Sequence, residues 1–252
     1  MSEPHGALSG AGSSRDGRHG TSPQAGLIEV RDLTKVYDGG SGVAALTELN
    51  LSFDSGEFAS IAGPSGSGKS TLLNIVGGLD RPSSGEVLFE GKSLGPLTDE
   101  GLAEFRLRNL GFVFQAYNLI PVLSAAENVE YPLVLQGLAH VSRRKKALKT
   151  LELVGLEGLG DRRPNQLSGG QQQRVAVARA IVHRPRVVLA DEPTANLDSR
   201  TAAALLDLME GLNRELGVTF IFSSHDPAVL TRASRVVRLK DGRLAPDIPG
   251  GD

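Results

Sequence analysis

Apolar side chains recur at nearly every second position in two early segments of the chain, residues 28–33 and residues 49–53. This period of two predicts strands that bury one face. Three glycines within residues 39–42 interrupt the apolar pattern between the two segments. We therefore expect short antiparallel strands at the start of the fold.

Three later segments are mainly apolar without a clear alternation, which predicts buried strands. They are residues 57–62, 187–190 and 218–222. The first run ends at a glycine, the second at two acidic residues and the third shortly before a histidine. A hairpin is expected in residues 236–244, with its turn at the Asp-Gly pair 241–242.

Helices are predicted from caps and from apolar residues at helical spacing. A buried helix is expected to start near Lys69, Ser142 is expected to cap a second, and Ser199 and Gly217 are expected to bound a third. The apolar face of the Ser142 helix carries Ala147, Leu148, Leu151 and Val154, and that of the Ser199 helix carries Leu205, Leu208, Leu212 and Leu216.

Composition excludes several classes of protein. The chain has no cysteine, so it can form neither a disulfide framework nor a thiolate zinc site. Its formal charge of −2 gives no reason to expect nucleic acid as a partner. No apolar run approaches the roughly 18 residues of a membrane span. The unusual count is glycine, with 31 among 252 residues.

The two ends of the chain differ from the rest. Residues 1–26 are rich in glycine and serine and carry little apolar surface to offset their ordering entropy, so a disordered tail is expected. This tail lacks the apolar core of a secretory signal. Residues 245–252 are expected to be a flexible C-terminus, which leaves residues 27–244 as the folded domain.

The segment from Gly63 to Ser70 reads Gly-Pro-Ser-Gly-Ser-Gly-Lys-Ser and matches the phosphate-binding loop pattern. Glycines let backbone N–H groups curl around phosphate oxygens, and the helix start adds partial positive charge. Lys69 is expected to reach the β- and γ-phosphates, and Ser70 to ligate Mg²⁺. The predicted contacts of the loop are Gly63, Pro64, Ser65, Gly66, Ser67, Gly68, Lys69, Ser70 and Thr71.

Two carboxylates end the buried run at residues 187–190. Asp191 is placed to hold Mg²⁺, and Glu192 to orient and deprotonate an attacking water. A solvated strand end is the alternative for such a pair, and the phosphate-binding loop earlier in the chain favours the catalytic interpretation.

A second phosphate-binding helix start is predicted at residues 167–174, which read Leu-Ser-Gly-Gly-Gln-Gln-Gln-Arg. Ser168 is expected to cap this helix, the glycines expose backbone N–H groups, and the helix continues until Pro185. One active site does not need two such receptors from one chain.

These motifs resemble those of the ABC transporter ATPases, whose signature reads LSGGQ. The resemblance implies an α/β fold of the P-loop NTPase class, with a RecA-like core, an antiparallel β subdomain and a helical subdomain at about residues 116–166. It also implies a homodimer in which each ATP is bound between one phosphate-binding loop and the partner's signature, here Ser168, Gly169, Gly170 and Gln171.

Four further residues match family positions. Tyr37 resembles the aromatic residue that stacks on adenine, and Gln115 the glutamine that touches Mg²⁺ and water and senses the membrane partner. Asp198 resembles a residue of the loop that crosses the dimer, and His225 the histidine that contacts the γ-phosphate. No expected catalytic position is substituted.

A finer resemblance points to the lipoprotein-release, macrolide-efflux and cell-division subgroup, the LolD, MacB and FtsE type. It rests on residues 77–86, 112–121 and 123–133. Residues 143–146, four consecutive cations, are expected to form the solvated start of a helix, with a basic binding site as the alternative. The apolar residues Leu119, Ile120, Leu123 and Leu133 are expected either to line a groove for a permease helix or to belong to the core of the subdomain.

The expected function is therefore that of a Mg²⁺-dependent ATPase subunit, which dimerises to drive a separate membrane permease in export or mechanotransmission. The subgroup implies a cytoplasmic protein attached to the inner face of the membrane through the permease. A cell-division ATPase that organises partners is the first alternative. A soluble ABC ATPase acting on ribosomes or DNA is the second, and it usually carries two cassettes in one chain.

Overall fold

The computed structural model describes residues 26–37 and 44–245. Of the predicted N-terminal tail only Gly26 falls within these ranges, and the glycines of residues 39–42 and residues 246–252 lie outside them. The strands are β1 (Ile28–Val36), β2 (Ala44–Phe53), β3 (Phe58–Ala62), β4 (Ser84–Phe89), β5 (Lys92–Ser93), β6 (Leu110–Val113), β7 (Val187–Asp191), β8 (Thr219–Ser224), β9 (Arg235–Lys240) and β10 (Arg243–Leu244). The helices are α1 (Lys69–Val76), α2 (Asp99–Asn109), α3 (Ala125–Leu135), α4 (His140–Leu153), the 3₁₀ turn η1 (Pro164–Gln166), α5 (Gly169–Ile181), α6 (Ser199–Leu216) and α7 (Pro227–Leu230).

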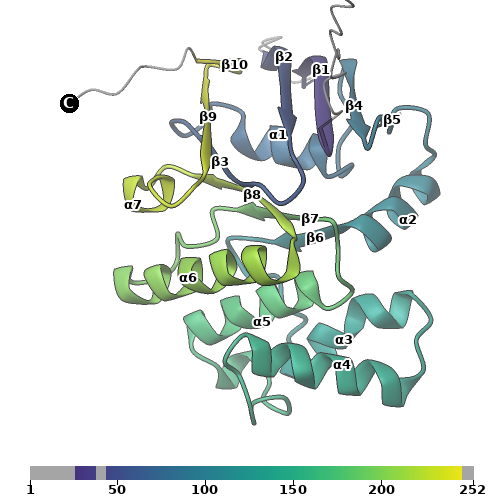
Figure 1. The fold of residues 1–252 in the computed structure, drawn as a ribbon, viewed down its shortest axis with the longest axis vertical. Helices are drawn as coiled ribbons and strands as arrows, with labels where there is room; N and C mark the ends of the chain where they lie inside the picture. Colours follow the sequence, from purple (N-terminus) through teal and green to yellow (C-terminus); the bar gives the residue numbers. More distant parts are fainter. Residues whose placement is uncertain (1–25, 38–43, 246–252) are drawn as a thin grey trace, which may run out of the picture.

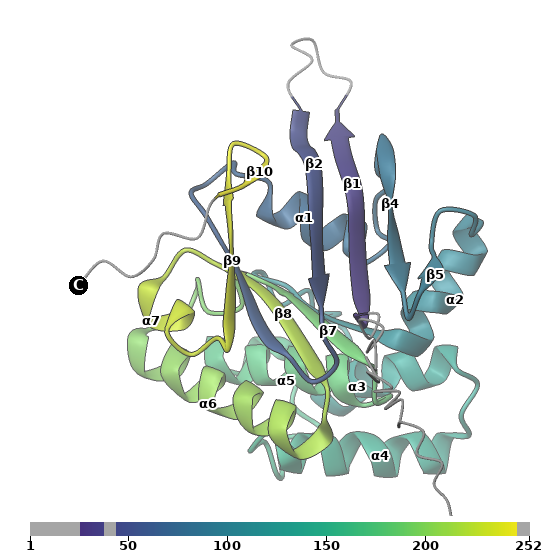
Figure 2. The same cartoon turned by 45° about the horizontal axis from the view of Figure 1, so that its top comes forward.

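The strands form two sheets, which Figures 1 and 2 show from two directions. A four-stranded antiparallel sheet has the order β2-β1-β4-β5, and a six-stranded sheet has the order β10-β9-β3-β8-β7-β6. Neighbours from β9 to β6 run parallel, and β10 is antiparallel to β9. The expected antiparallel start is thus confirmed, with strands of 9 and 10 residues that are longer than predicted.

The strands β3, β7 and β8 of the six-stranded sheet are buried on both faces. Phe58 on β3 packs against Phe220 and Phe222 on β8, in a core that also includes α5 and α6. The intervening Ile221 faces a second core, which the antiparallel sheet and α1 share. This two-sided burial explains why apolar residues occupy consecutive positions in β3, β7 and β8 instead of alternating with exposed polar ones.

The helical part of the fold corrects two predicted caps. The α4 helix begins at His140 after Ala139, which makes no side-chain cap, so Ser142 lies inside the first turn. The α6 helix is capped by Asp198, whose side chain accepts a hydrogen bond from Thr201 N–H, rather than by Ser199. Both errors arise because a hydroxyl or carboxyl side chain near a helix start can cap it only if it falls at the N-cap position, and the backbone sets that position.

The predicted stripe on α6 is partly confirmed. Leu205 and Leu212 are buried, Leu208 packs partly against the core, and Leu216 is 42% exposed. Leu206 and Met209 are buried as well and complete the apolar face. The helix ends at Gly217 with a φ of 65°, as predicted.

The C-terminal hairpin forms between β9 and β10, with its turn at Asp241 and Gly242. Both residues have positive φ, 51° and 73°, which matches the turn geometry that favours Asp-Gly. Among the described residues, no helix combines the length and apolar character needed to cross a membrane.

Candidate nucleotide-binding site

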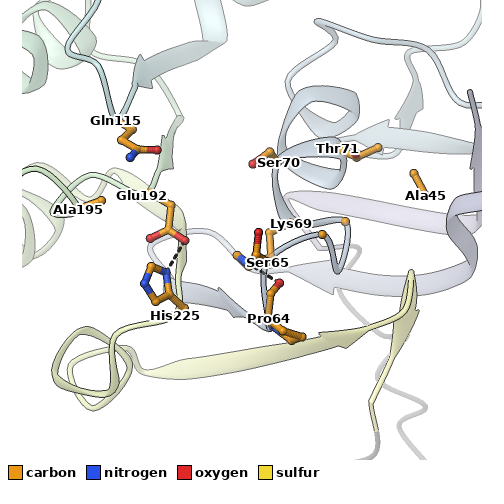
Figure 3. A pocket seen from close by; sticks show the side chains of 12 residues that line it. Ala45, Pro64, Ser65, Lys69, Ser70, Thr71, Gln115, Glu192, Ala195 and His225 are labelled. Carbon is orange, nitrogen blue, oxygen red and sulfur yellow. Dashed lines mark hydrogen bonds and ion pairs between the residues drawn. The ribbon is translucent and has the colours of Figure 1, made fainter.

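A cavity of about 550 Å³ lies where α1 begins and where β7 and β8 end (Figure 3). Ligand sites in α/β folds usually lie at the carboxyl ends of the parallel strands. The residues that line the cavity are Ala45, Pro64, Ser65, Gly66, Gly68, Lys69, Ser70, Thr71, Gln115, Glu192, Ala195 and His225.

The phosphate-binding loop needs its glycines for space and for backbone conformation. Gly68 precedes α1 with a φ of 101°, and a Cβ there would lie 2.6 Å from the carbonyl oxygen of Ala45. A Cβ on Gly63 would lie 2.3 Å from the carbonyl oxygen of Leu239. The loop is therefore closely packed by neighbouring backbone, and only glycine fits at these two positions.

Lys69 folds its side chain back over the loop. Its Nζ donates to the carbonyl oxygens of Gly63 at 2.9 Å and Pro64 at 3.0 Å. Lys69 is 7% exposed and lines the cavity, so its ammonium group has little water to hydrate it. A phosphate in the cavity would supply the charge that these neutral carbonyls do not.

The side chains of Ser70 and Asp191, two of the three predicted Mg²⁺ ligands, are in contact. The Ser70 hydroxyl donates to Asp191 Oδ1 at 3.0 Å, and the Ser223 hydroxyl donates to the same oxygen at 2.6 Å. Within the described ranges, no cluster of three or more His, Cys, Asp or Glu side chains could hold a metal ion. A hydroxyl beside one carboxylate nevertheless fits Mg²⁺, which takes few protein ligands and completes its shell with water and substrate phosphates.

Glu192 and His225 lie side by side on one wall of the cavity, as Figure 3 shows, with His225 Nδ1 2.9 Å from Glu192 Oε1. Glu192 has a φ of 44°, a conformation that non-glycine residues adopt at an energetic cost. Its backbone N–H donates to the Ser223 hydroxyl at 2.9 Å, which fixes the turn at the end of β7. The carboxylate of Glu192 is thus directed into the cavity by strained backbone.

Gln115 follows β6 and lines the cavity. Its backbone carbonyl accepts a hydrogen bond of 3.0 Å from the Asn196 side chain, so this loop is attached to the loop that follows β7. Asp198 is not among the lining residues. Its carboxylate accepts from Thr201 N–H and Oγ1, and these hydrogen bonds hold the pKa of Asp198 below its ordinary value.

The predicted second phosphate receptor forms the start of α5, outside the cavity. Ser168 caps the helix, since its hydroxyl accepts from Gln171 N–H at 3.3 Å while the Gln171 side chain accepts from Ser168 N–H at 2.9 Å. Tight packing against Thr201 requires glycine at position 170, where a Cβ would lie 2.4 Å from the Thr201 methyl group. The structure therefore does not bring Ser168, Gly169, Gly170 and Gln171 to the site that holds Lys69.

Tyr37 also lies outside the lining residues. It directly follows Val36, the last residue of β1. Val36 pairs with Ala44 on β2, and the next residue along β2, Ala45, lines the cavity. Tyr37 is 47% exposed, and its hydroxyl donates to Asp80 at 2.9 Å.

A second cavity, of about 410 Å³, is an apolar groove between α2, β6, α3 and α5. Its lining includes Leu79, Leu107, Phe112, Phe114, Tyr131 and Leu135. The predicted groove residues Leu119, Ile120, Leu123 and Leu133 are not among those that line it. Leu133 is fully buried in the core, so the core alternative holds for that residue.

The cation run at residues 143–146 is only half solvated, which corrects the prediction. Arg143 and Arg144 bond to Glu130, a buried carboxylate on α3, at 3.0 Å and 3.2 Å. Arg144 also pairs with Asp161. Sequence reasoning missed this network because Glu130 lies on the neighbouring helix, among apolar positions.

Comparison with known proteins identifies the family. A family model described as ABC transporter matches residues 46–195. The lipoprotein-releasing system ATP-binding protein LolD of Chromohalobacter salexigens is 45% identical over 88% of this chain and 94% of its own length. The macrolide export ATP-binding/permease protein MacB of Wolinella succinogenes is 48% identical over 88% of this chain, which spans 34% of that longer protein.

A solved structure is similar in fold as well as in sequence. The ATP-binding cassette MJ0796 of Methanocaldococcus jannaschii, in a dimeric post-hydrolysis state bound to ADP and Pi, aligns with a TM-score of 0.80. It is 45% identical, and the alignment covers 86% of this chain and 96% of that one. Together with the phosphate-binding loop and the paired Glu192 and His225, these matches show that the chain belongs to the ABC transporter family, as an ATP-hydrolysing, ATP-binding subunit of the LolD and MacB type.

Proposed function

We propose that two copies of this chain bind two ATP molecules between them and use their hydrolysis to move a membrane permease. The observation that carries the proposal is the cavity itself, which holds Lys69, Ser70 and the Glu192–His225 pair but lacks the capped start of α5. A second copy would supply Ser168, Gly169, Gly170 and Gln171 to the exposed side of the nucleotide. Two identical half-sites then give a closed twofold dimer with two working sites.

Each cavity residue has a distinct task in this scheme. The backbone N–H groups from Gly63 to Thr71, except at Pro64, which has none, surround the phosphates, and Lys69 neutralises the terminal charge. Glu192 accepts a proton from the attacking water, and His225 holds Glu192 and the γ-phosphate in register. Tyr37 stacks on adenine at the end of β1. Asp198 lies at the start of α6, where it faces the second copy.

Ser70 and Asp191 would hold Mg²⁺, with Gln115 reaching it from the end of β6. The ion supplies neutralisation of phosphate charge when bound. The chain's own part is to keep these oxygens together, which the hydrogen bond from Ser70 to Asp191 does.

The apolar groove is the proposed docking site for a helix of the permease. Its lining joins α2, α3 and α5 with the segment that follows β6, which carries Gln115. An amphipathic helix seated there would contact the same loop that enters the nucleotide cavity. This attachment would place the protein on the cytoplasmic face of the membrane.

The dimer is tested with Glu192→Gln, which removes the base but keeps the shape of the side chain. With ATP and Mg²⁺ the variant should elute at twice the monomer mass and contain trapped ATP, whereas the unmodified chain should cycle and dissociate. Monomer only, under conditions in which ATP binding is saturated, would refute the shared site.

Co-purification from membranes distinguishes the alternatives. The proposed function predicts a permease bound to the trapped variant. Division proteins in its place would favour the cell-division alternative, and ribosomes or DNA would favour a soluble ATPase.

A further inference from the structure

We propose that Asp80 and Lys35 are positioning residues that fix the ring of Tyr37 for adenine binding. Neither residue belongs to the phosphate-binding loop or to the pair at Glu192 and His225. The inference rests on the proposed function, because it takes Tyr37 as the adenine contact.

Asp80 holds both partners at once. The Tyr37 hydroxyl donates to Asp80 Oδ2 at 2.9 Å, and Lys35 Nζ donates to Asp80 Oδ1 at 2.7 Å. Lys35 Nζ also donates to the carbonyl oxygen of Arg81 at 2.8 Å. The hydroxyl end of the Tyr37 ring and the ammonium group of Lys35 are therefore attached to one carboxylate.

Lys35 contacts the ring directly as well. Its Nζ lies 4.7 Å from the centroid of the Tyr37 ring, within the range of a cation–π interaction. One face of the ring is thus occupied by Lys35, while Tyr37 keeps 47% of its surface exposed. A base that stacks on Tyr37 would use the face opposite to Lys35.

The charge of the cluster favours a fixed arrangement. Burial raises the pKa of the Asp80 carboxyl, but hydrogen bonds from Lys35, Tyr37 and the Arg81 N–H outweigh it and hold this pKa below its ordinary value. The carboxylate therefore stays ionised at neutral pH, and ionised acceptors make the stronger hydrogen bonds. The Lys35 side chain is only 12% exposed, so solvent competes weakly for its ammonium group.

The fold connects this cluster to the phosphate-binding loop. Asp80 is attached to the C-terminal end of α1, because the N–H groups of Leu79 and Asp80 both donate to the Asn74 carbonyl, at 2.8 Å and 3.2 Å. The same helix begins with Lys69 and Ser70. One short helix therefore sets the spacing between the ring that would read the base and the groups that would hold the phosphates.

Fixing the Tyr37 ring before ATP arrives lowers the entropic cost of binding the base. An aromatic side chain at a strand end that turned freely would lose conformational freedom when a base stacks on it. Asp80 and Lys35 remove that freedom before the nucleotide arrives. Their effect should be seen with ligands that carry a base and be absent with ligands that carry phosphates alone.

The experiment compares ATP with inorganic tripolyphosphate, both with Mg²⁺, by titration calorimetry on the full chain. Asp80→Ala should weaken ATP binding about threefold to tenfold, as expected for the loss of a charged hydrogen bond, and leave tripolyphosphate unchanged. Lys35→Met should act in the same direction. Asp99→Ala is the matched control, because Asp99 bonds to Arg81 and touches neither Lys35 nor Tyr37.

Tyr37→Ala separates this inference from the proposed function. If it leaves ATP affinity unchanged, the adenine contact itself is wrong. If it weakens ATP and Asp80→Ala does not, the contact stands and the positioning role is refuted. Positioning also requires that Asp80→Ala add nothing in the Tyr37→Ala background.

Equal weakening of ATP and tripolyphosphate by Asp80→Ala would overturn the proposal in favour of a general structural role. Should the alanine variant fail to fold, Asp80→Asn takes its place, because it keeps the shape of the side chain and removes the charge. The proposal is then judged by the same comparison, in which Asp80→Asn should weaken ATP binding and leave tripolyphosphate binding unchanged.

Discussion

His225 Nδ1 lies 2.9 Å from Glu192 Oε1, although the two residues follow different strands, β8 and β7. The contact exists because β7 and β8 are parallel neighbours, with Asp191 opposite Ser223 in the register. Strand pairing thus places the Glu192 carboxylate beside the His225 imidazole at the carboxyl ends of β7 and β8.

The first prediction follows from this contact. His225→Ala should lower ATP hydrolysis about a hundredfold or more, because the catalytic base Glu192 loses the residue that holds it in register with the γ-phosphate, and should leave ATP binding close to normal. Phosphate release and nucleotide titration measure the two quantities. His140→Ala, on α4, is the control and should change neither. A parallel loss of binding in His225→Ala would contradict a role confined to the chemical step.

The second prediction concerns the apolar groove. Leu135 lines it and is 58% exposed, so Leu135→Glu should fold normally and prevent association with the permease. Basal ATPase activity of the isolated chain should not change. Val141→Glu is the matched control, because Val141 is 80% exposed on α4 and does not line the groove. Recovery of permease with both variants would exclude this groove as the docking site.

The third prediction concerns the buried carboxylate of Glu130. Glu130→Ala removes the carboxylate that Arg143 and Arg144 share, although Arg144 keeps its pair with Asp161. We expect a loss of about 2 kcal/mol in unfolding free energy, reduced by the partial exposure of the arginines. Urea denaturation measures it. Glu104→Ala, which breaks an exposed pair with Arg108, should cost under about 0.5 kcal/mol. Similar costs for the two variants would show that burial of Glu130 contributes nothing.

The fourth prediction is a pH dependence. Burial lowers the pKa of His183 below 6.5, although its hydrogen bond to the Leu110 carbonyl opposes the shift. The unfolded chain then binds a proton more readily than the folded one, so His183 stabilises the fold above pH 6.5 and loses this contribution as pH falls through its folded pKa.

The measurement is the melting temperature at about pH 7.5 and about pH 5.5. His183→Gln should lose less stability between these values than the unmodified chain does, since glutamine does not titrate. His140→Gln serves as the comparison. An unchanged pH dependence in His183→Gln would contradict the lowered pKa of His183.

The sequence predicted correctly those elements whose structure depends on residues close together in the chain. The Gly63–Ser70 loop, the cap at Ser168 and the stop at Gly217 each depend on residues within a turn of one another. The buried strands β3, β7 and β8 were equally clear, because both of their faces are covered. The nucleotide cavity followed from these elements.

Contacts between distant segments were beyond such signals. Nothing near Lys35 indicates that Asp80 will bond to it, and the groove lining is assembled from α2, β6, α3 and α5. Ser142 and Ser199 show the same limit on a smaller scale, since the true helix starts depend on where the preceding chain enters. Tertiary packing, rather than the residue type, decides each of these cases.

The helix α5 joins the segment proposed to contact the partner's nucleotide to the apolar groove. It is 13 residues long, about 20 Å, and its buried side chains, including Val175 and Val177, fix it in the core. Ser168 caps one end, while Arg179 and Ala180 near the other end line the apolar groove. Arg179 also donates to the Tyr117 and Asn118 carbonyls. If a permease helix seated in the groove displaced α5, the capped end at Ser168 would move with it, because both ends belong to one continuous helix.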